Sequence, residues 1–332
     1  METMMILDNK DLNDNMVDAF SDDTEFLTPS GWKSLDTIND HDMVAQYDHK
    51  DGSITFVRPI IIPVDHTENV YEITAPKRQA RQVVSARHII YFEHRDENTG
   101  FEWKAKTCEA HELNDITMNA SIRFITSGTI MNHGNGMTIQ DRLHVAIRES
   151  GRVERQDTTD GTTIISFDPR KTMQAKRLQR MSLEASWYMT IDDTTGRLLL
   201  FAPSEEQHQV AYHTAYPLDF ITYEWCRDFM MESACWGNNV NNNGHGASYH
   251  PRYDDDASFY SCISTLSGYE SNEHMVNGKP TIDVSFESKN ISAEAFMVNI
   301  LQDRHVTGMR VPTMYAITRN GERPVISGCS TR

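Results

Sequence analysis

The sequence predicts a mainly β protein that is interrupted by a segment of mixed α and β structure. From Glu25 to about Ser127, short apolar or alternating runs are separated by Gly, Asp and Asn turns, as is typical of β-strands. From Thr138, apolar residues recur at helical spacing, and strand texture returns from Thr281. We expect one domain to be inserted into a surface loop of the other, because such loops tolerate insertions.

The elements follow in a definite order along the chain. Strands of the first segment are expected within residues 43–48, 54–64, 70–74, 81–92 and 121–126. In the middle segment, helices are expected within 138–151, 169–189, 219–236 and 259–269, a strand within 162–167, and an exposed loop over 237–256. The last strands are expected within 281–286 and 314–328, where Asn320-Gly321 carries the signal of a tight hairpin.

Size and hydropathy narrow the class of protein. The 332 residues exceed the ~100–200 residues that usually share one core, so two cores are expected. The mean hydropathy is -0.55, and no apolar run approaches the ~20 residues that a bilayer-spanning helix needs. The first residues are acidic and lack the basic and apolar parts of a secretory signal, so we expect a cytoplasmic protein without membrane partners.

Charge and cysteine content exclude further classes. The 48 Asp and Glu against 31 Lys and Arg give a net charge of -17, which repels a phosphate backbone, so DNA binding should be weak. The 5 cysteines have scattered spacings that favour neither a disulfide framework nor a zinc site, and we expect no metal and no cofactor. Cys329, beside Gly328 and Ser330, is the one cysteine placed where chemical use is expected.

Three segments of the chain resemble sequence blocks of inteins. The segment AFSDDTEFLTPSGWKSLDTINDHDMVAQYD, which starts at Ala19, resembles the first block. VVSARHIIYF is similar to the second block, whose signature is Thr-x-x-His, with Ser85 in the Thr place and His88 as the histidine. VPTMYAITRNGERPVISG, followed by Cys329, is similar to the last block, especially of phage-type inteins.

The resemblance implies a fold and a set of boundaries. The expected fold is a mainly β, horseshoe-like Hint splicing domain with an inserted α/β LAGLIDADG-like domain. The Hint domain would comprise residues 19–127 and 290–328, and the insert residues 128–289. Residues 1–18 and 329–332 would be remnants of the flanking exteins.

The resemblance also assigns roles in peptide-bond rearrangement. Such chemistry needs an internal nucleophile and a stabilised tetrahedral intermediate. His88 would donate a proton to the scissile amide nitrogen, and the hydroxyl of Ser85 would orient the junction. The alternative for His88 is a half-buried structural histidine in a strand.

Both junctions depart from the intein pattern. Ala19 stands where the family usually has Cys, and a methyl group cannot perform the acyl shift. Two interpretations remain open: an introduced Cys-to-Ala change, or the natural class that begins with Ala and uses the downstream Cys directly. Gly328 runs straight into Cys329 without the Asn that would form a succinimide. The alternative for Cys329 is an incidental tail cysteine.

His305 and Asp303 lie just upstream of the last block. Inteins often use a histidine or an aspartate near this point to activate the final carbonyl. The alternative is that both are exposed loop residues.

The insert resembles a LAGLIDADG homing endonuclease of the kind found in phage inteins. DRLHVAIRESG matches the first motif helix and WCRDFMMESACWGN the second. Each family helix ends in an acid that holds Mg²⁺. Here Ser150 and Gly237 take those places, and Glu149 is rotated by ~100° from the first of them, so we expect nuclease activity to be lost.

Two further sets of residues are candidate binding groups. One set comprises Lys171, Lys176, Arg177 and Arg180. These cations form either a strip that faces DNA or a solvated helix face. The polar loop contains a second set of candidate metal ligands, His245, His250 and Asp254–Asp256. Their spacing matches no zinc or EF-hand template.

Together these observations predict autocatalytic protein splicing by a monomer whose partners are its own exteins, trapped as an inactive precursor by the changed junctions. The alternatives are an active homing endonuclease, which needs a pair of motif-end acids, and an autoprocessing domain that cleaves without ligating.

Overall fold

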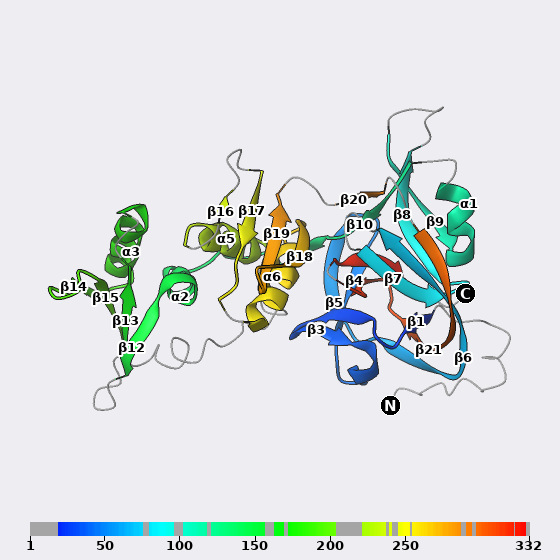
Figure 1. Cartoon of the computed structure of the whole chain (residues 1–332), viewed down its shortest axis with the longest axis horizontal. Helices are drawn as coiled ribbons and strands as arrows, with labels where there is room; N and C mark the ends of the chain where they lie inside the picture. The colour runs from blue at the N-terminus through cyan, green and yellow to red at the C-terminus, as the bar shows by residue number, and fades with distance from the viewer. Residues whose placement is uncertain are drawn as a thin grey trace. The chain divides into compact units, whose positions relative to one another are not determined.

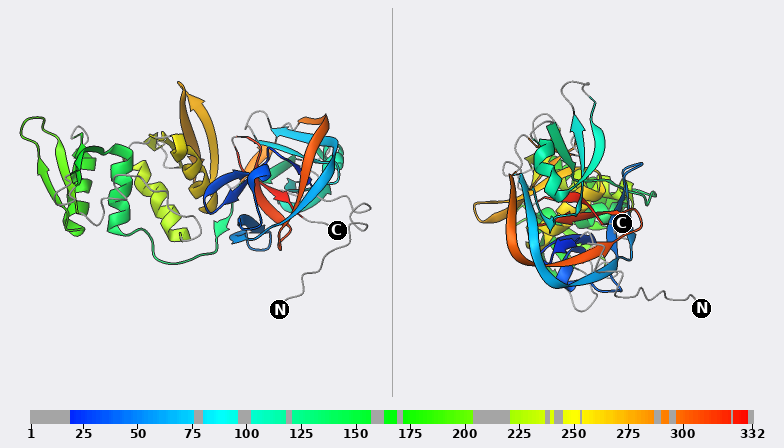
Figure 2. Two further views of the ribbon diagram at one scale, coloured as in Figure 1. Left: turned by 90° about the horizontal axis from the view of Figure 1, so that it is seen from below. Right: turned by 90° about the vertical axis from the view of Figure 1, so that its right-hand side faces the viewer.

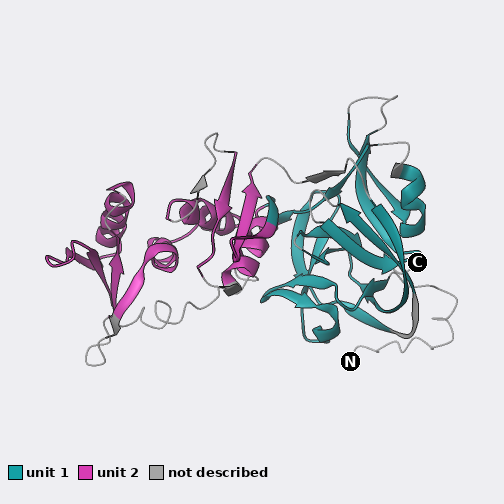
Figure 3. Ribbon diagram, in the orientation of Figure 1, with its two compact units in different colours: residues 1–129, 268–272, 288–332 teal, residues 130–267, 273–287 magenta. Residues whose placement is uncertain are grey.

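The computed structural model describes most of the chain. Described are residues 19–329, except 76–79, 96–101, 118–120, 157–162, 169–171, 204–220, 237–238, 241–244, 253, 287–289, 294–296 and 322. The chain divides into two compact units (Figure 3). Unit 1 comprises residues 1–129, 268–272 and 288–332, and unit 2 comprises residues 130–267 and 273–287.

Unit 1 contains a closed barrel of four antiparallel strands in the order β1-β21-β6-β7 (Figure 1). Its strands are β1 (Ala19–Ser21), β6 (Ile60–Ala75), β7 (Ala80–Ser85) and β21 (Met297–Arg310). The long strands β6 and β21 run side by side for most of their length, as both views of Figure 2 show. The short β1 lies between two partners, since Ala19 pairs with Gly308 of β21 and Phe20 pairs with Val84 of β7.

The remaining strands of unit 1 belong to an 11-stranded sheet. Its main path runs β11-β5-β4-β22-β23-β8-β10-β20, and β2, β3 and β9 attach beside it. The strands are β2 (Glu25–Thr28), β3 (Gly31–Ser34), β4 (Val44–Asp48), β5 (Ser53–Val57), β8 (Ile89–Arg95), β9 (Lys104–Glu109), β10 (Ser121–Ile125), β11 (Thr129–Ile130), β20 (Asn290–Ala293), β22 (Tyr315–Arg319) and β23 (Val325–Gly328). The short helical segments are η1 (Leu35–Thr37), η3 (Ala110–Glu112) and α1 (Leu113–Thr117).

One buried cluster joins the barrel to the sheet. It includes Phe20 of β1, Ile90 of β8, Met309 of β21 and Cys329, each at most 1% exposed. In β8, Ile90, Tyr91 and Phe92 are consecutive buried residues, so this strand is covered on both of its faces, because successive side chains of a strand point to opposite faces. Residues from the beginning, middle and end of unit 1 therefore share one core.

Unit 2 contains four of the described helices and two four-stranded sheets, except for residues 270–272 of one strand, which are assigned to unit 1. One sheet has the order β12-β13-β15-β14, with β12 (Arg152–Gln156), β13 (Thr163–Phe167), β14 (Tyr188–Ile191) and β15 (Leu198–Ala202). The other has the order β16-β17-β19-β18, with β16 (Asn239–Val240), β17 (Gly246–Tyr249), β18 (Glu270–Val276) and β19 (Lys279–Ser285). The helices are α2 (Ile139–Ser150), α3 (Thr172–Glu184), α5 (Tyr223–Ala234) and α6 (Asp254–Leu266), and α2 packs against both α3 and α5.

The predicted fold class, a Hint horseshoe with an α/β insert, is wrong. The described part of unit 1 forms a closed barrel and an 11-stranded sheet, and the chain as a whole is mostly β with some helices. The difference comes from β21, because no strand was predicted between residues 290 and 314. Its pairing with both β1 and β6 closes the barrel.

Two predicted elements of unit 2 also differ. The helix expected to reach residue 189 ends at Glu184, because Ser186 adopts a left-handed φ of 59° and the chain enters β14 at Tyr188. The expected loop over 237–256 contains β17, in which Ala247 and Tyr249 are buried. The Gly and Asn content of this segment favoured a loop, so this strand was not predicted.

A matched pair of methionines on β21 tests whether this strand is part of the core. Met309 is 0% exposed and Met297 is 50% exposed. We expect Met309→Ala to lower the free energy of unfolding by about 2–5 kcal/mol, because it leaves a cavity. Met297→Ala should change it by less than about 0.5 kcal/mol. Urea unfolding followed by circular dichroism measures both, and equal effects would contradict the placement of β21.

Candidate functional site

The turn between β7 and β8 brings Ser85 and His88 into the interior of unit 1. Ser85 is the last residue of β7, and its carbonyl oxygen accepts a hydrogen bond from the amide of His88 at 3.1 Å. Both residues are buried, at 1% and 0% exposure. A tight turn between two strands therefore holds a hydroxyl and an imidazole, three positions apart in sequence, away from water.

Ser85 contacts the backbone at the predicted upstream junction. The amide nitrogen of Ala19 donates a hydrogen bond to Oγ of Ser85 at 3.3 Å. This nitrogen would be the leaving group if the peptide bond before Ala19 were broken. The hydroxyl predicted to orient the junction thus lies at the atom where orientation would matter.

His88 contacts the segment that precedes the predicted downstream junction. Its Nε2 lies 2.9 Å from Oγ of Ser327, and its ring packs edge-on against Phe20 with the ring centroids 4.6 Å apart. Burial lowers the pKa of His88 from 6.5 to about 3, so the imidazole is neutral at neutral pH. His88 thus bonds through Nε2 to Ser327, whereas the Ala19 amide bonds to Ser85.

The downstream residues Gly328 and Cys329 are held closely. A Cβ at Gly328 would lie 2.9 Å from Cβ of Ile89 and still closer to the Ile89 carbonyl oxygen, so only glycine fits there. The amide of Cys329 donates to the carbonyl oxygen of Met314 at 2.8 Å, and the Cys329 side chain is 0% exposed. Within one buried region, Ser85 thus bonds to the Ala19 amide and His88 bonds to Ser327, while the side chains of Ala19 and Cys329 belong to separate buried clusters.

Asn320 connects the two ends of unit 1 and was predicted only as a turn residue. Its Oδ1 accepts from the amide of Val83 at 3.3 Å, and its Nδ2 donates to Ser21 Oγ at 3.3 Å and to Thr24 Oγ1 at 2.9 Å. The loop between β22 and β23 is longer than a two-residue hairpin, since Thr318 pairs with Val325. This longer loop lets Asn320 turn inward and hold β1 against β7.

His305 is not brought into this buried region. It lies in β21, pairs with Thr67 of β6 and is exposed. Asp303 is also exposed and has a left-handed φ of 51° at a register shift between Leu301 and Arg304. The role predicted for this pair at the downstream carbonyl stays a prediction.

The predicted nuclease positions lie at the ends of α2 and α5. Oγ of Ser150 donates to the carbonyl oxygen of Trp236 at 2.8 Å, and Gly237 lies outside the described residues. The carboxylate of Glu149 accepts hydrogen bonds from Ser233 at 3.0 Å and from Tyr260. The two helix ends are thus joined through hydrogen bonds of Ser150 and Glu149.

A pocket of about 350 Å³ opens at this place. Ser150 and Trp236 line it, and Phe167, Leu178 and Leu198 are among its other walls. Among the residues that the structure describes, no group of three or more His, Cys, Asp or Glu side chains could hold a metal ion.

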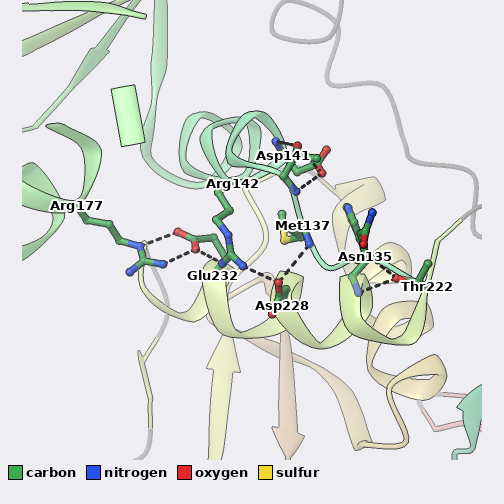
Figure 4. A network of polar contacts seen from close by, with 10 residues as sticks. Asn135, Met137, Asp141, Arg142, Arg177, Thr222, Asp228 and Glu232 are labelled. Atoms are coloured by element: carbon green, nitrogen blue, oxygen red, sulfur yellow. Dashed lines mark hydrogen bonds and ion pairs between the residues drawn. The ribbon is translucent and has the colours of Figure 1, made fainter. Parts of the chain in front are cut away.

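A charge network ties α5 to two other helices, as Figure 4 shows. Glu232 of α5 is buried and accepts hydrogen bonds from Arg177 at 2.8 and 2.5 Å, from Arg142 at 2.9 Å and from Trp236 at 2.9 Å. Burial raises the pKa of Glu232, but these donors outweigh it and hold the pKa below its usual value. Arg142 also pairs with Asp228 at 2.6 Å.

The predicted DNA-facing strip is therefore divided. Arg177 turns toward Glu232, whereas Lys176 and Arg180 are exposed on α3 and Lys171 lies outside the described residues. Lys176 and Arg180 are four positions apart and share one helix face.

The residues of the polar loop are likewise separated. His245 is exposed, and Nδ1 of His250 lies 3.2 Å from Oγ1 of Thr281. Asp256 is buried in an ion pair with Arg148. The side chains of Asp254 and Asp255 lie outside the described residues.

Comparisons with known proteins give limited similarity. No family model matches the chain. It is 22% identical over 261 residues to the beta subunit of ribonucleoside-diphosphate reductase from Aquifex aeolicus (strain VF5), covering 67% of this chain and 36% of that protein. The chain thus spans about a third of the length of this curated relative.

Two solved structures are similar to part of the chain. Full-length DUF199/WhiA from Thermatoga maritima gives a TM-score of 0.32 at 10% identity, covering 44% of this chain and 50% of that one. The N-terminal LAGLIDADG domain of DUF199/WhiA gives 0.29 at 9% identity, covering 44% and 75%. Neither neighbour is described as a Hint or intein domain, and at these TM-scores neither carries an argument about the fold of this chain. A likeness of this extent carries no argument about function.

No helix in the described part of the chain has the length and apolar character required to cross a membrane.

The buried His88 should make the stability of the chain depend on pH. Its pKa is about 3 in the folded state and 6.5 in the unfolded state, so between these values the unfolded state binds one more proton. Stability should therefore fall as pH drops from 6.5 towards 3, by up to ~1.4 kcal/mol per pH unit from this group. We expect His88→Gln to make the pH dependence of urea unfolding shallower by that amount. Equal slopes in both proteins would show that the imidazole is not buried in neutral form.

Proposed function

We propose that this chain is a precursor of intein-type protein splicing and that its changed junctions hold it inactive. The observation that carries the proposal is that one turn contacts both junction segments. Oγ of Ser85 accepts from the amide of Ala19, and Nε2 of His88 bonds to Ser327, which immediately precedes Gly328 and Cys329. Splicing requires both ends of the excised segment to meet at one place.

Burial of the site favours the same chemistry. Ser85, His88 and Cys329 are each at most 1% exposed, so external substrates have little access and the groups are suited to act on their own backbone. In such a water-poor region, the hydrogen bond that the Ala19 amide donates to Oγ of Ser85 holds the leaving nitrogen more strongly than it would in water. The substrate is then the chain itself, and no cofactor is needed.

The substitutions at the junctions explain the proposed inactivity. Ala19 has no nucleophilic atom, and Gly328 precedes Cys329 without an intervening Asn amide. Residues 1–18 and 330–332 lie outside the described residues, and their identity as exteins is part of the proposal. In the alternative class that begins with Ala, the thiolate of Cys329 would attack the carbonyl before Ala19 and produce a branched chain, which mass spectrometry would detect.

Repair of both junctions tests the proposal. As it stands, the chain should remain intact during long incubation at neutral pH. Ala19→Cys combined with an Asn inserted between Gly328 and Cys329 should produce ligated flanks, whereas either change alone should give at most cleavage at one junction. The insertion falls after the end of β23, so the strand itself is preserved. Intact-mass spectrometry distinguishes ligated flanks from cleavage products. Cleavage without ligation would indicate an autoprocessing domain that does not splice.

Variants of the repaired chain separate the roles of the turn residues. His88→Ala should slow the upstream step by ~10²–10⁴-fold, the range for loss of a positioned acid–base group. Ser85→Ala should slow it less. His94→Ala is the matched control, because His94 lies on the same strand, β8, and pairs with Ile122 away from the site. A repaired chain that folds but stays inert, or that splices equally well without His88, would refute the proposal.

The second candidate function, DNA cleavage, is disfavoured by the ends of α2 and α5. Ser150 is bonded to Trp236, and the Glu149 carboxylate is occupied by Ser233 and Tyr260. We expect no Mg²⁺-dependent cleavage of DNA that carries the uninterrupted host sequence, because the metal would lack its bridging carboxylates. An agarose-gel assay of such a plasmid checks this, and a metal-dependent cut would restore the nuclease alternative. DNA binding should be weak and steeply salt-dependent at a net charge of -17.

A further inference from the structure

The buried side chains of Gln82 and His88 both bond to the hydroxyl of Ser327. The proposed splicing chemistry has no role yet for Gln82. Gln82 of β7 is 2% exposed, and His88 and Ser327 are each 0% exposed. Oγ of Ser327 donates to Oε1 of Gln82 at 2.9 Å and lies 2.9 Å from Nε2 of His88. The three side chains thus form a hydrogen-bonded chain in the interior of unit 1.

The direction of these hydrogen bonds fixes the tautomer of the imidazole. A serine hydroxyl has a single hydrogen, and here Gln82 receives it. The Ser327 oxygen must therefore accept from His88, which places the imidazole proton on Nε2. Since a neutral imidazole carries only one N–H, Nδ1 holds a lone pair. Within the described residues, neither Nδ1 of His88 nor Nε2 of Gln82 has a hydrogen-bond partner.

We propose that Gln82 is a positioning residue that acts through Ser327 to keep His88 in the Nε2–H tautomer. The hydrogen bond made by one ring nitrogen decides which nitrogen is protonated, as with other histidines held by a second residue. The lone pair on Nδ1 is then the one basic atom that the ring offers within the site. Its use in peptide-bond rearrangement rests on the proposed function, whereas the tautomer itself does not.

The tautomer can be measured on the full chain as it stands. In ¹⁵N-histidine-labelled protein at neutral pH, long-range ¹H–¹⁵N spectra distinguish a protonated, pyrrole-type nitrogen from an unprotonated, pyridine-type one. We expect His88 to show a pyrrole-type Nε2 and a pyridine-type Nδ1. A His88→Gln spectrum assigns the signals by their loss.

Gln82→Met tests the positioning role, because methionine keeps the length of the side chain and removes the acceptor. The Ser327 hydroxyl is then free to donate to Nε2, so the single Nε2–H tautomer should be lost and Nδ1–H should appear. Gln46→Met is the matched control. Gln46 is also buried, but it bonds to Thr55 and to the Thr313 amide, so its replacement should leave the His88 signals unchanged.

Two results would overturn the inference: an Nδ1–H tautomer in the parent chain, or an undiminished Nε2–H tautomer in Gln82→Met. If Gln82→Met does not fold, as its amide spectrum would show, the tautomer of the parent chain decides alone. Because none of these measurements requires splicing, a negative result here is distinct from an inert chain after repair of the junctions.

Discussion

The pairing of β21 with both β1 and β6 is the constraint on which the arrangement of unit 1 depends. It closes the four-stranded barrel and places Ala19 opposite Gly308, with Phe20 against Val84 of β7. A strand of three residues has little stability alone, so β1 depends on its two neighbours and on the side chain of Asn320. Held in this way, the Ala19 amide reaches Ser85.

A second set of polar contacts organises unit 2 around Glu232. A buried carboxylate is stable only when paired and hydrogen-bonded, and here Arg142, Arg177 and Trp236 supply the donors. Two of the cations of unit 2 are thereby directed inward, to Glu232, rather than outward. Together with the bonded ends of α2 and α5, these ion pairs link the helices of unit 2. Among the described residues of the predicted strip, Lys176 and Arg180 are the exposed cations.

Local patterns predicted strands of unit 1 from short apolar or alternating runs, but the single strand expected within residues 81–92 is divided into β7 and β8 by the turn that contains His88. β21 was missed because register shifts after Leu301 and His305 break its alternation, and its pairing partners lie far away in sequence. Gln82 and Ser327 were missed for a related reason: a buried polar residue is recognised by its partners, and these come together only in the folded chain. The Arg177 side chain likewise points inward because it pairs with Glu232 of α5. The helical spacing of α3 alone does not predict this pairing.

The central claim is that the turn after β7 holds the backbone at the upstream junction. Hydrogen–deuterium exchange of the Ala19 amide, followed by NMR on the full chain, tests it most directly. The account predicts that this amide is protected and that Ser85→Ala accelerates its exchange, while the Cys329 amide, which donates to Met314, stays protected. An Ala19 amide that exchanges as fast as one in an unstructured peptide, or one whose rate Ser85→Ala leaves unchanged, would contradict it.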